Sequence, residues 1–289
     1  MSLAEGLAGE RAWEVRRAGF PPVIRFARPT RTGVVSTTGG HCKLNCAHCG
    51  GRYLRGMLSP AEALRRARTA GAPASWLVSG GCDHRGRVPM PLGLLQELGR
   101  SARLVLHVGL LDLHRAEEVA TAAAVVAFDV VGDRETAREV MGLDVGVEDY
   151  LDVYRALARH TRVVPHICLG LSGGRIRGEL AALEALAGEC PQEIVFLVFS
   201  PTPGTVYAGH QPPPLAAVGS VLGLARRLFP TTPLTLGCMR PGGHYRQALD
   251  ELAVKLGMNG IAVPSPAAGR AAGERGLEII QGEECCVLH

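Results

Sequence analysis

The feature that most constrains this chain is a loop of three cysteines, Cys42, Cys46 and Cys49, which follows an apolar, β-prone run. Thiolates this close in sequence can hold one compact centre, and soft sulfur ligands select zinc, copper(I) or iron–sulfur clusters. A structural zinc site and an electron-transfer 4Fe–4S cluster each take four protein ligands. Three thiolates without a fourth therefore indicate a cluster with one open iron. A zinc site completed by His41 or His48 is the alternative.

Composition favours a soluble α/β protein. Of the 289 residues, 47% are hydrophobic and 20% charged, and the net charge of +4 includes no dense basic run. We therefore expect neither nucleic acid nor a membrane surface as a partner. The sequence has no secretory signal pattern and no apolar run of about 18 residues, which predicts a cytoplasmic protein. In that reducing compartment, nine cysteines indicate metal ligation rather than disulfides.

Predicted strands and helices alternate along the chain, which is typical of a parallel sheet. After a short strand at 23–26, eight strands follow, the number that closes a (β/α)8 TIM-type barrel, full or partial. A doubly wound open sheet is the alternative, but no G-x-G-x-x-G follows the first of the eight strands. We expect an N-terminal helix and lead-in at 1–31, the barrel at 32–265, and a C-terminal helix with a cysteine-bearing tail at 266–289. The eight strands are predicted at 32–38, 76–78, 103–108, 125–131, 162–170, 193–199, 233–238 and 260–263, and the helices at 3–18, 60–70, 91–100, 114–123, 134–141, 147–159, 176–187, 214–228, 243–256 and 266–274.

Active sites of such barrels lie at the carboxyl ends of the strands, so the residues that follow each strand are candidates. The second of the eight strands leads into Ser79, Gly80, Gly81, Cys82 and Asp83. Two glycines let the backbone approach a ligand closely, although a tight turn needs them equally.

Three further candidates lie on the middle strands. Asp129 is at the centre of the fourth predicted strand, and His166 and Cys168 share one face of the fifth. A histidine or cysteine on a strand is often only a core residue. At His107 and Cys168 both interpretations stay open.

The last barrel strands and the chain end supply more thiols. Cys238 and Arg240 share one face after the seventh strand, which suits a cluster with a basic residue nearby. We interpret the terminal Cys285 and Cys286 as ligands of a second cluster, joined by Cys238 and Cys82, with the tail folded over the barrel mouth. The tail has few apolar residues, so we expect metal to order it. A redox-active pair or a disordered end is the alternative.

Several segments together resemble the radical S-adenosylmethionine (SAM) superfamily, and within it the biotin-synthase-like proteins that act in pairs as a two-component lipoyl synthase. The resemblance covers about residues 10–289. It is carried by HCKLNCAHC at 41–49, YLRGM at 53–57, SGGC at 79–82, GRVP at 86–89, PTPGT at 201–205, CMRP at 238–241 and CC at 285–286.

The resemblance implies that the cysteine loop (residues 37–49) holds a 4Fe–4S cluster through Cys42, Cys46 and Cys49. The open iron of that cluster binds SAM, and an electron then releases a 5'-deoxyadenosyl radical. In the family a Gly-Gly-Glu element receives the amino group of SAM, whereas here Cys82 replaces the acid. The expected SAM-binding residues are Ser79, Gly80, Gly81, Asp129 and His166.

For the reaction, the resemblance implies hydrogen abstraction from a protein-bound octanoyl or mercapto-octanoyl chain, followed by capture of sulfur from an auxiliary 4Fe–4S cluster. The implied partners are an octanoylated carrier protein or lipoyl domain, a companion radical SAM component, and an electron donor such as ferredoxin or flavodoxin. Another radical SAM reaction, such as biotin-type thiolation or hydrogen abstraction on a small molecule, is the alternative. A non-catalytic iron–sulfur or zinc protein is the second alternative.

Overall fold

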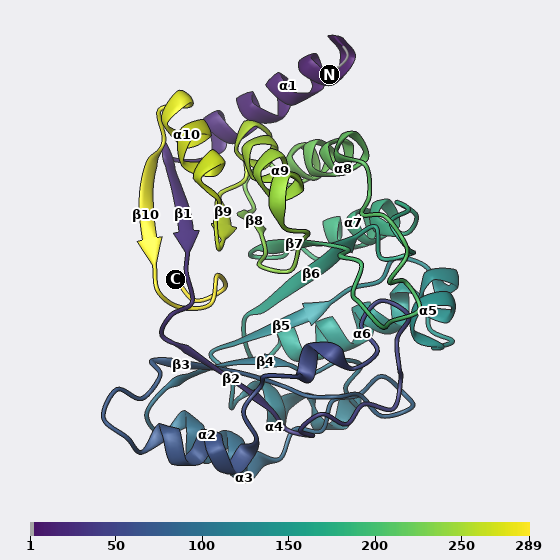
Figure 1. Cartoon of the computed structure of the whole chain (residues 1–289), viewed down its shortest axis with the longest axis vertical. Coiled ribbons are helices and arrows are strands. Elements are labelled where there is room, and N and C mark those ends of the chain that lie inside the picture. Colours follow the sequence, from purple (N-terminus) through teal and green to yellow (C-terminus); the bar gives the residue numbers. More distant parts are fainter. Residues whose placement is uncertain (1–2) are drawn as a thin grey trace.

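The chain builds one sheet of ten parallel strands, which curls into a partial barrel with helices on its outer side (Figure 1). A computed structural model describes residues 3–289 and the side chains of 9–289. The strand order is β10-β1-β9-β8-β7-β6-β5-β4-β3-β2, so β10 and β2 are the two edges. The strands are β1 (Val23–Ala27), β2 (Thr32–Ser36), β3 (Ser75–Ser79), β4 (Arg103–His107), β5 (Val125–Asp129), β6 (Val163–Leu169), β7 (Ile194–Val198), β8 (Leu234–Leu236), β9 (Gly260–Ala262) and β10 (Glu278–Gly282).

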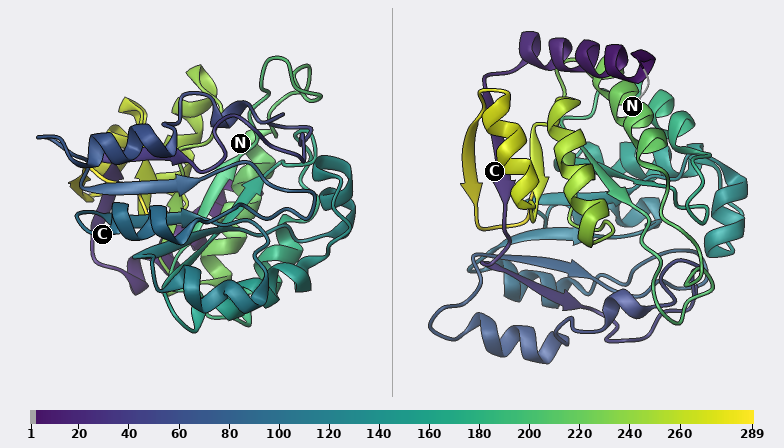
Figure 2. Two further views of the ribbon diagram at one scale, coloured as in Figure 1. Left: turned by 90° about the horizontal axis from the view of Figure 1, so that it is seen from below. Right: turned by 45° about the horizontal axis from the view of Figure 1, so that its top comes forward.

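Helices connect the strands as the alternating pattern predicted. The helix after β2 begins at Ser59, whose side chain and backbone form a capping box with Glu62. The first helix packs against α8 (Figure 2), and its Ala12 and Trp13 are buried. The side chains of Leu3, Leu7 and Ala8 lie outside the described residues. The helices are α1 (Leu3–Gly19), α2 (Pro60–Ala67), α3 (Leu92–Gly99), α4 (Ala116–Ala120), α5 (Arg134–Met141), α6 (Val147–Ala158), α7 (Glu179–Ala187), α8 (Leu215–Leu228), α9 (Gly243–Lys255) and α10 (Pro266–Glu274), with 3-10 turns η1 (Arg52–Leu54) and η2 (Leu113–Arg115).

The predicted eight barrel strands are β2 to β9, and the partial-barrel prediction is confirmed. The sheet does not close between β9 and β2, because β1 pairs with β9 and β10 pairs with β1. The sequence did not predict β10, whose residues are mostly exposed at the sheet edge and lack a strong apolar alternation. The lead-in and the tail segment thus each add a strand to the barrel sheet; the three-segment division stays a prediction.

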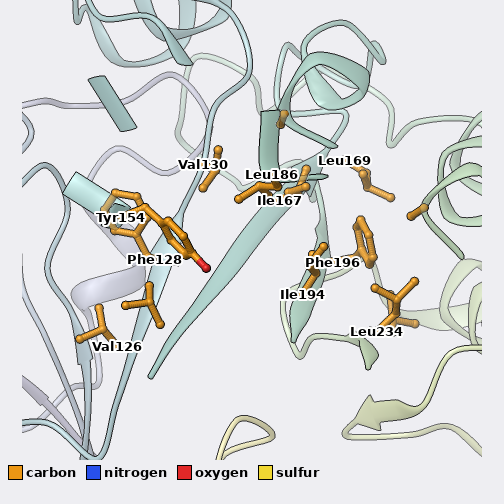
Figure 3. Close-up of a cluster of buried hydrophobic side chains, with 14 of the residues drawn as sticks. Val126, Phe128, Val130, Tyr154, Ile167, Leu169, Leu186, Ile194, Phe196 and Leu234 are labelled. Carbon is orange, nitrogen blue, oxygen red and sulfur yellow. The ribbon is translucent and has the colours of Figure 1, made fainter. Parts of the chain in front are cut away.

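The main core fills the space between the convex face of the sheet and the helices (Figure 3). Phe128, Ile167 and Phe196 point into this layer from β5, β6 and β7, and Leu186 of α7 meets them there. Burying a side chain of this size contributes about 1.5–3 kcal/mol, so this layer alone can hold the sheet and helices together. Alternate residues of the same strands face the concave side.

The concave side is filled at its amino end by the C-terminal tail, residues 283–289. Val287 is fully buried there, and Leu288 packs beside it against valines and alanine of the inner face. These inner-face residues are Val105, Val125, Ala127, Val164 and Val195. The tail therefore does bury apolar surface, contrary to the expectation that only metal could order it.

Polar contacts hold the tail at the amino ends of the strands. The backbone N–H of Cys285 donates to Thr32 Oγ1 at 2.9 Å, and Arg162 Nη1 donates to the Val287 carbonyl at 2.9 Å. Arg103 forms an ion pair with Glu284. Thr32 and Arg103 begin strands, and Arg162 directly precedes one. The tail therefore forms the floor of the barrel and does not cover its mouth, as Figure 1 shows.

None of the helices in residues 3–289 is long and apolar enough to cross a lipid bilayer.

Candidate active site at the carboxyl ends of the strands

The cysteine loop follows β2 and is fixed at its centre. The backbone N–H of Ala47 donates to the Val140 carbonyl at 2.7 Å, and the Tyr207 N–H donates to the Ala47 carbonyl at 3.0 Å. The side chains of Ala47, Val140 and Tyr207 are buried together. Asn45 has a positive φ of 48°, the left-handed conformation that Asn tolerates better than most residues. The loop is thus held in one shape between α5 and the segment after β7.

Two thiols and a histidine of this loop converge, and the charge of the third thiol, Cys42, acts on Cys46. Ligand atoms of Cys46, His48 and Cys49 lie within 4.8 Å of one another, and Cys42 Sγ accepts a hydrogen bond from the backbone N–H of Cys82 at 3.3 Å. A hydrogen bond from the Cys46 thiol is the largest of the effects that lower the pKa of Cys49 to about 4. The same interaction raises the pKa of Cys46. Because metals bind the thiolate and not the thiol, Cys49 already favours the ligating form.

His48 keeps the zinc alternative open. Its buried Nδ1 has no hydrogen-bond partner among the described residues, and it lies beside two of the thiols. His41 is exposed and is not part of this group of ligand atoms. If zinc binds here, the structure favours His48 over His41 as its nitrogen ligand.

Gly80 and Gly81 pack directly against the cysteine loop. The Gly81 N–H donates to Thr38 Oγ1 at 2.7 Å, and a Cβ at Gly81 would overlap the His41 carbonyl and come within 2.6 Å of Cys42 Cα. The glycines are therefore needed for close packing. The carbonyls of Gly80 and Gly81 accept no hydrogen bond from the residues that the structure describes. They are free to accept one from a ligand.

Ser79, Cys82 and Asp83 flank these glycines. Ser79 ends β3, and its carbonyl accepts a hydrogen bond from Thr37 N–H at 2.8 Å, which joins this strand end to the cysteine loop. Burial, with the nearby charge of Cys42 as the second cause, raises the pKa of Cys82 to about 12. The Asp83 carboxylate accepts hydrogen bonds from the backbone N–H groups of Arg85 and Arg87 and from Arg87 Nε. Asp83 thus shapes its own loop.

Two histidines and an aspartate meet on the inner face of the middle strands. Asp129 is the last residue of β5, not its centre as predicted, and pairs in register with His166 of β6. The rings of His107 and His166 lie 5.4 Å apart, edge to face. Burial lowers the pKa of both His107 and His166. The charge of the exposed Asp129 acts in the opposite direction on both rings. Cys168 is also close to Asp129, whose charge adds to the effect of burial and raises the pKa of the thiol.

The orientation of His166 follows from one hydrogen bond. Its Nδ1 lies 2.9 Å from the Val164 carbonyl, so Nδ1 carries the proton in the neutral ring and Nε2 is an acceptor. Burial lowers the pKa of His166 to about 4, so the ring is neutral near pH 7. His107, through its ring contact with His166, and Cys168, two residues further along β6, lie on the same inner face, where a ligand could contact them.

Cys238 and Arg240 differ in their surroundings. Cys238 is exposed after β8, and desolvation followed by the charge of Cys285 raises its pKa. Arg240 is buried instead: Nε pairs with Asp250 at 2.9 Å, and Nη1 donates to the carbonyls of Gly237 and Ala262. The charge of Arg240 still acts on Cys238, but its guanidinium is engaged in joining strand ends, so a cluster role for Arg240 stays a prediction.

The terminal cysteines interact with each other and, through charge, with Cys238. A hydrogen bond from Cys286 lowers the pKa of Cys285 and, by the same interaction, raises that of Cys286. The charges of Cys285 and Cys238 further raise the pKa of Cys286. Of the four cysteines expected at a second cluster, Cys285 and Cys286 share a hydrogen bond, Cys238 interacts with them through charge, and Cys82 lies with the cysteine loop.

No protein-family model and no curated protein matches the sequence. Solved structures do share its architecture. Methylornithine synthase (PylB) matches with a TM-score of 0.70 at 15% identity, over 97% of this chain and 90% of that one. This chain has the PylB fold. The FeFe-hydrogenase maturase HydG from Carboxydothermus hydrogenoformans gives the same score and identity, over 96% and 72%. Streptococcus suis SuiB bound to S-adenosylmethionine gives a TM-score of 0.52 at 13% identity, over 80% of this chain and 52% of SuiB.

Proposed function

We propose that this chain is a radical SAM enzyme whose cysteine loop holds a SAM-binding 4Fe–4S cluster. The observation that carries the proposal is the meeting of Cys46 and Cys49 in one loop with Cys42, whose Sγ accepts the Cys82 N–H next to the free carbonyls of Gly80 and Gly81. Both features lie at the carboxyl end of a barrel whose fold is also found in SuiB, which has been solved with SAM bound. When bound, the cluster and SAM supply a radical that can take hydrogen from an unactivated carbon.

The residues of the loop fit such a cluster. Cys42, Cys46 and Cys49 supply thiolates, and the Cys82 N–H donates to Cys42 Sγ, a bond that tunes the potential of cluster sulfur ligands. The Gly80 and Gly81 carbonyls can accept hydrogen bonds from an ammonium group. Asp129 can accept from hydroxyls, and His166 can accept through Nε2.

We propose further that the enzyme attaches sulfur to a protein-bound octanoyl or mercapto-octanoyl chain in lipoyl cofactor formation. The support is that, besides burial, the charge of Cys285 raises the pKa of Cys238, and the charges of Cys285 and Cys238 both raise the pKa of Cys286. Thiolates that repel one another in this way are stabilised when they share a metal centre. An auxiliary 4Fe–4S cluster there would stand between the floor of the barrel and the SAM site and would supply the sulfur.

The partners that this reaction requires belong to the same proposal. An octanoylated carrier protein or lipoyl domain presents the chain, a companion radical SAM component attaches the other sulfur, and a ferredoxin or flavodoxin supplies electrons. An apolar chain must then pass the polar group of His107, Asp129 and His166 to reach the second cluster.

That polar group favours a second candidate, hydrogen abstraction from a small polar molecule. Imidazole and carboxylate side chains on the inner face suit a substrate with hydrogen-bonding groups better than an alkyl chain. The fold match to methylornithine synthase agrees with this alternative at the level of architecture.

The deciding experiment is anaerobic incubation of the reconstituted protein with SAM, a reductant and an octanoylated lipoyl-domain peptide, read by mass spectrometry. We expect 5'-deoxyadenosine and a peptide that gains one sulfur. Formation of 5'-deoxyadenosine without any change in the peptide would favour the second candidate. Replacing Cys42, Cys46 and Cys49 together by alanine should abolish 5'-deoxyadenosine, whereas replacing the exposed Cys190 should not.

A further inference from the structure

A cavity of about 290 Å³ opens at the amino ends of the strands, on the far side of the barrel from the cysteine loop. Its walls are β1, Ile280 of β10, the amino ends of β7, β8 and β9, and the C-terminal tail. The polar groups on its walls are those of Arg25, Glu193, Thr235, Asn259 and His289, and the thiol residue on its wall is Cys286. None of these polar residues belongs to the site described above.

Cys286 separates this cavity from the inside of the barrel. It lines the cavity and also packs against the inner layer of aliphatic side chains that contacts Val287. Cys285 packs on the same layer but does not line the cavity. The adjacent cysteines are therefore not equivalent, and of the two only Cys286 lines this cavity.

Arg25 gives the cavity its positive charge. Its side chain is exposed, and among the side chains of residues 9–289 it has no hydrogen bond or ion pair. After burial and closer partners, the charge of Arg25 also acts in the lowering direction on the pKa of both Glu193 and His289. The oxygens of Glu193 are already engaged, since they accept hydrogen bonds from Thr235 Oγ1 at 2.8 Å and Arg162 Nη2 at 2.5 Å. An unpaired guanidinium on the wall of a small cavity that a thiol also lines suits a small anion.

We propose that this cavity is a rear entry site through which a small sulfur anion, hydrosulfide, reaches Cys286 without passing the barrel mouth. The inference rests on the proposed function, because a cluster that gives up sulfur in each turnover has to be rebuilt. The mouth is then occupied by SAM and substrate, whereas the rear cavity stays accessible. Arg25 attracts the anion, and Cys286 is the first cluster ligand that it meets.

The first test uses metal-free protein under anaerobic conditions, with iodoacetate as a small anionic probe and iodoacetamide as its neutral counterpart. Each alkylates a thiolate with loss of iodide, and peptide mass spectrometry gives the rate at Cys286. We expect Arg25→Gln to slow iodoacetate by about threefold or more, as loss of a nearby attracting charge does, and to leave iodoacetamide unchanged. Arg17→Gln, an exposed arginine on α1, is the matched control. Equal iodoacetate rates in both variants would overturn the role of Arg25.

The second test narrows the cavity. Ile280 of β10 lines it, whereas Gln281, the next residue, is exposed and does not. We expect Ile280→Trp to slow alkylation of Cys286 by both probes and to slow the return of iron and sulfide to the second cluster when ferrous iron and sodium sulfide are added. Gln281→Trp should match the natural protein, and in both variants the cysteine-loop cluster should load at the natural rate.

The outcomes separate this inference from the proposed function. If the natural protein binds only one cluster, the proposed sulfur donor is wrong, and the alkylation rates still report whether the rear cavity admits anions. If two clusters form and Ile280→Trp rebuilds the second at the natural rate, the rear entry is wrong and the proposed function stands. Should Ile280→Trp fail to fold, Arg25→Gln carries the test alone, since its side chain is exposed.

Discussion

Gly81 shows how one missing side chain links two loops. A Cβ there would overlap the His41 carbonyl and crowd Cys42 Cα. We therefore expect Gly81→Ala to displace the cysteine loop and to lower the iron bound there, rather than to weaken SAM binding alone, as a residue that only faces the ligand would. Iron and sulfide analysis after reconstitution measures this.

Gly93 provides the control for that substitution. A Cβ at Gly93 in α3 would meet no atom within 4 Å, and an alanine there also favours the helix. Normal iron content in Gly81→Ala, with SAM binding lost, would show instead that the glycine only faces the ligand.

Glu193 makes stability depend on pH. Burial raises its pKa from the ordinary 4.5 to about 7, so between these values the folded protein holds a proton that the unfolded chain has lost. Its contribution to the free energy of unfolding is complete below about pH 4.5 and is lost as the pH rises toward 7, at about 1.4 kcal/mol per pKa unit. We expect Glu193→Gln to flatten the rise in thermal stability as the pH falls through this window. Glu184→Gln, on the exposed side of α7, should leave the pH profile unchanged.

Among the elements, the C-terminal tail has the clearest double role. It buries Val287, pairs Glu284 with Arg103, and carries the two terminal cysteines. Truncation after Gly282 should therefore lower the melting temperature even of metal-free protein, because the inner face of the strands loses its cover. It should also remove the iron of the second cluster and leave the cysteine-loop iron in place.

A double substitution of Cys285 and Cys286 by serine separates these two effects. It keeps the apolar and ionic contacts of Val287 and Glu284, so we expect nearly natural stability in the metal-free protein together with loss of the second cluster. Truncated protein that keeps both clusters and still attaches sulfur to its substrate would show that the tail only covers the floor of the barrel.

The connections between the last strands depend on Arg240 and Asp250. Both side chains are fully buried, and Asp250 also accepts a hydrogen bond from the Ser265 N–H at 2.7 Å. Removing one partner of such a pair leaves the other charge buried, which typically costs about 3–5 kcal/mol. Asp250→Asn should therefore destabilise the protein strongly in a denaturant titration, whereas Glu251→Gln, at an exposed pair on the same helix, should cost less than about 1 kcal/mol.

At the scale of the whole molecule, the candidate sites form layers along the axis of the partial barrel. The cysteine loop with Gly80 and Gly81 lies at the carboxyl ends of the strands, the polar group of His107, Asp129 and His166 lies below it, and the tail closes the amino end. Two 4Fe–4S clusters in this arrangement would bring about eight irons per chain after reconstitution. About four irons would indicate that only the cluster at the SAM site forms. Zinc without sulfide would favour a zinc site that includes His48.

The sequence by itself determined the parallel α/β architecture, the eight barrel strands and the grouping of Cys42, Cys46 and Cys49, because hydrophobic periodicity and ligand spacing are local properties. Only the tertiary structure decided where distant groups meet. It placed the tail at the floor of the barrel, turned Arg240 toward Asp250, added β10 to β1, and assigned Cys82 to the neighbourhood of Cys42. These outcomes depend on strand order and on which face each side chain takes, and packing between residues far apart in the chain decides both.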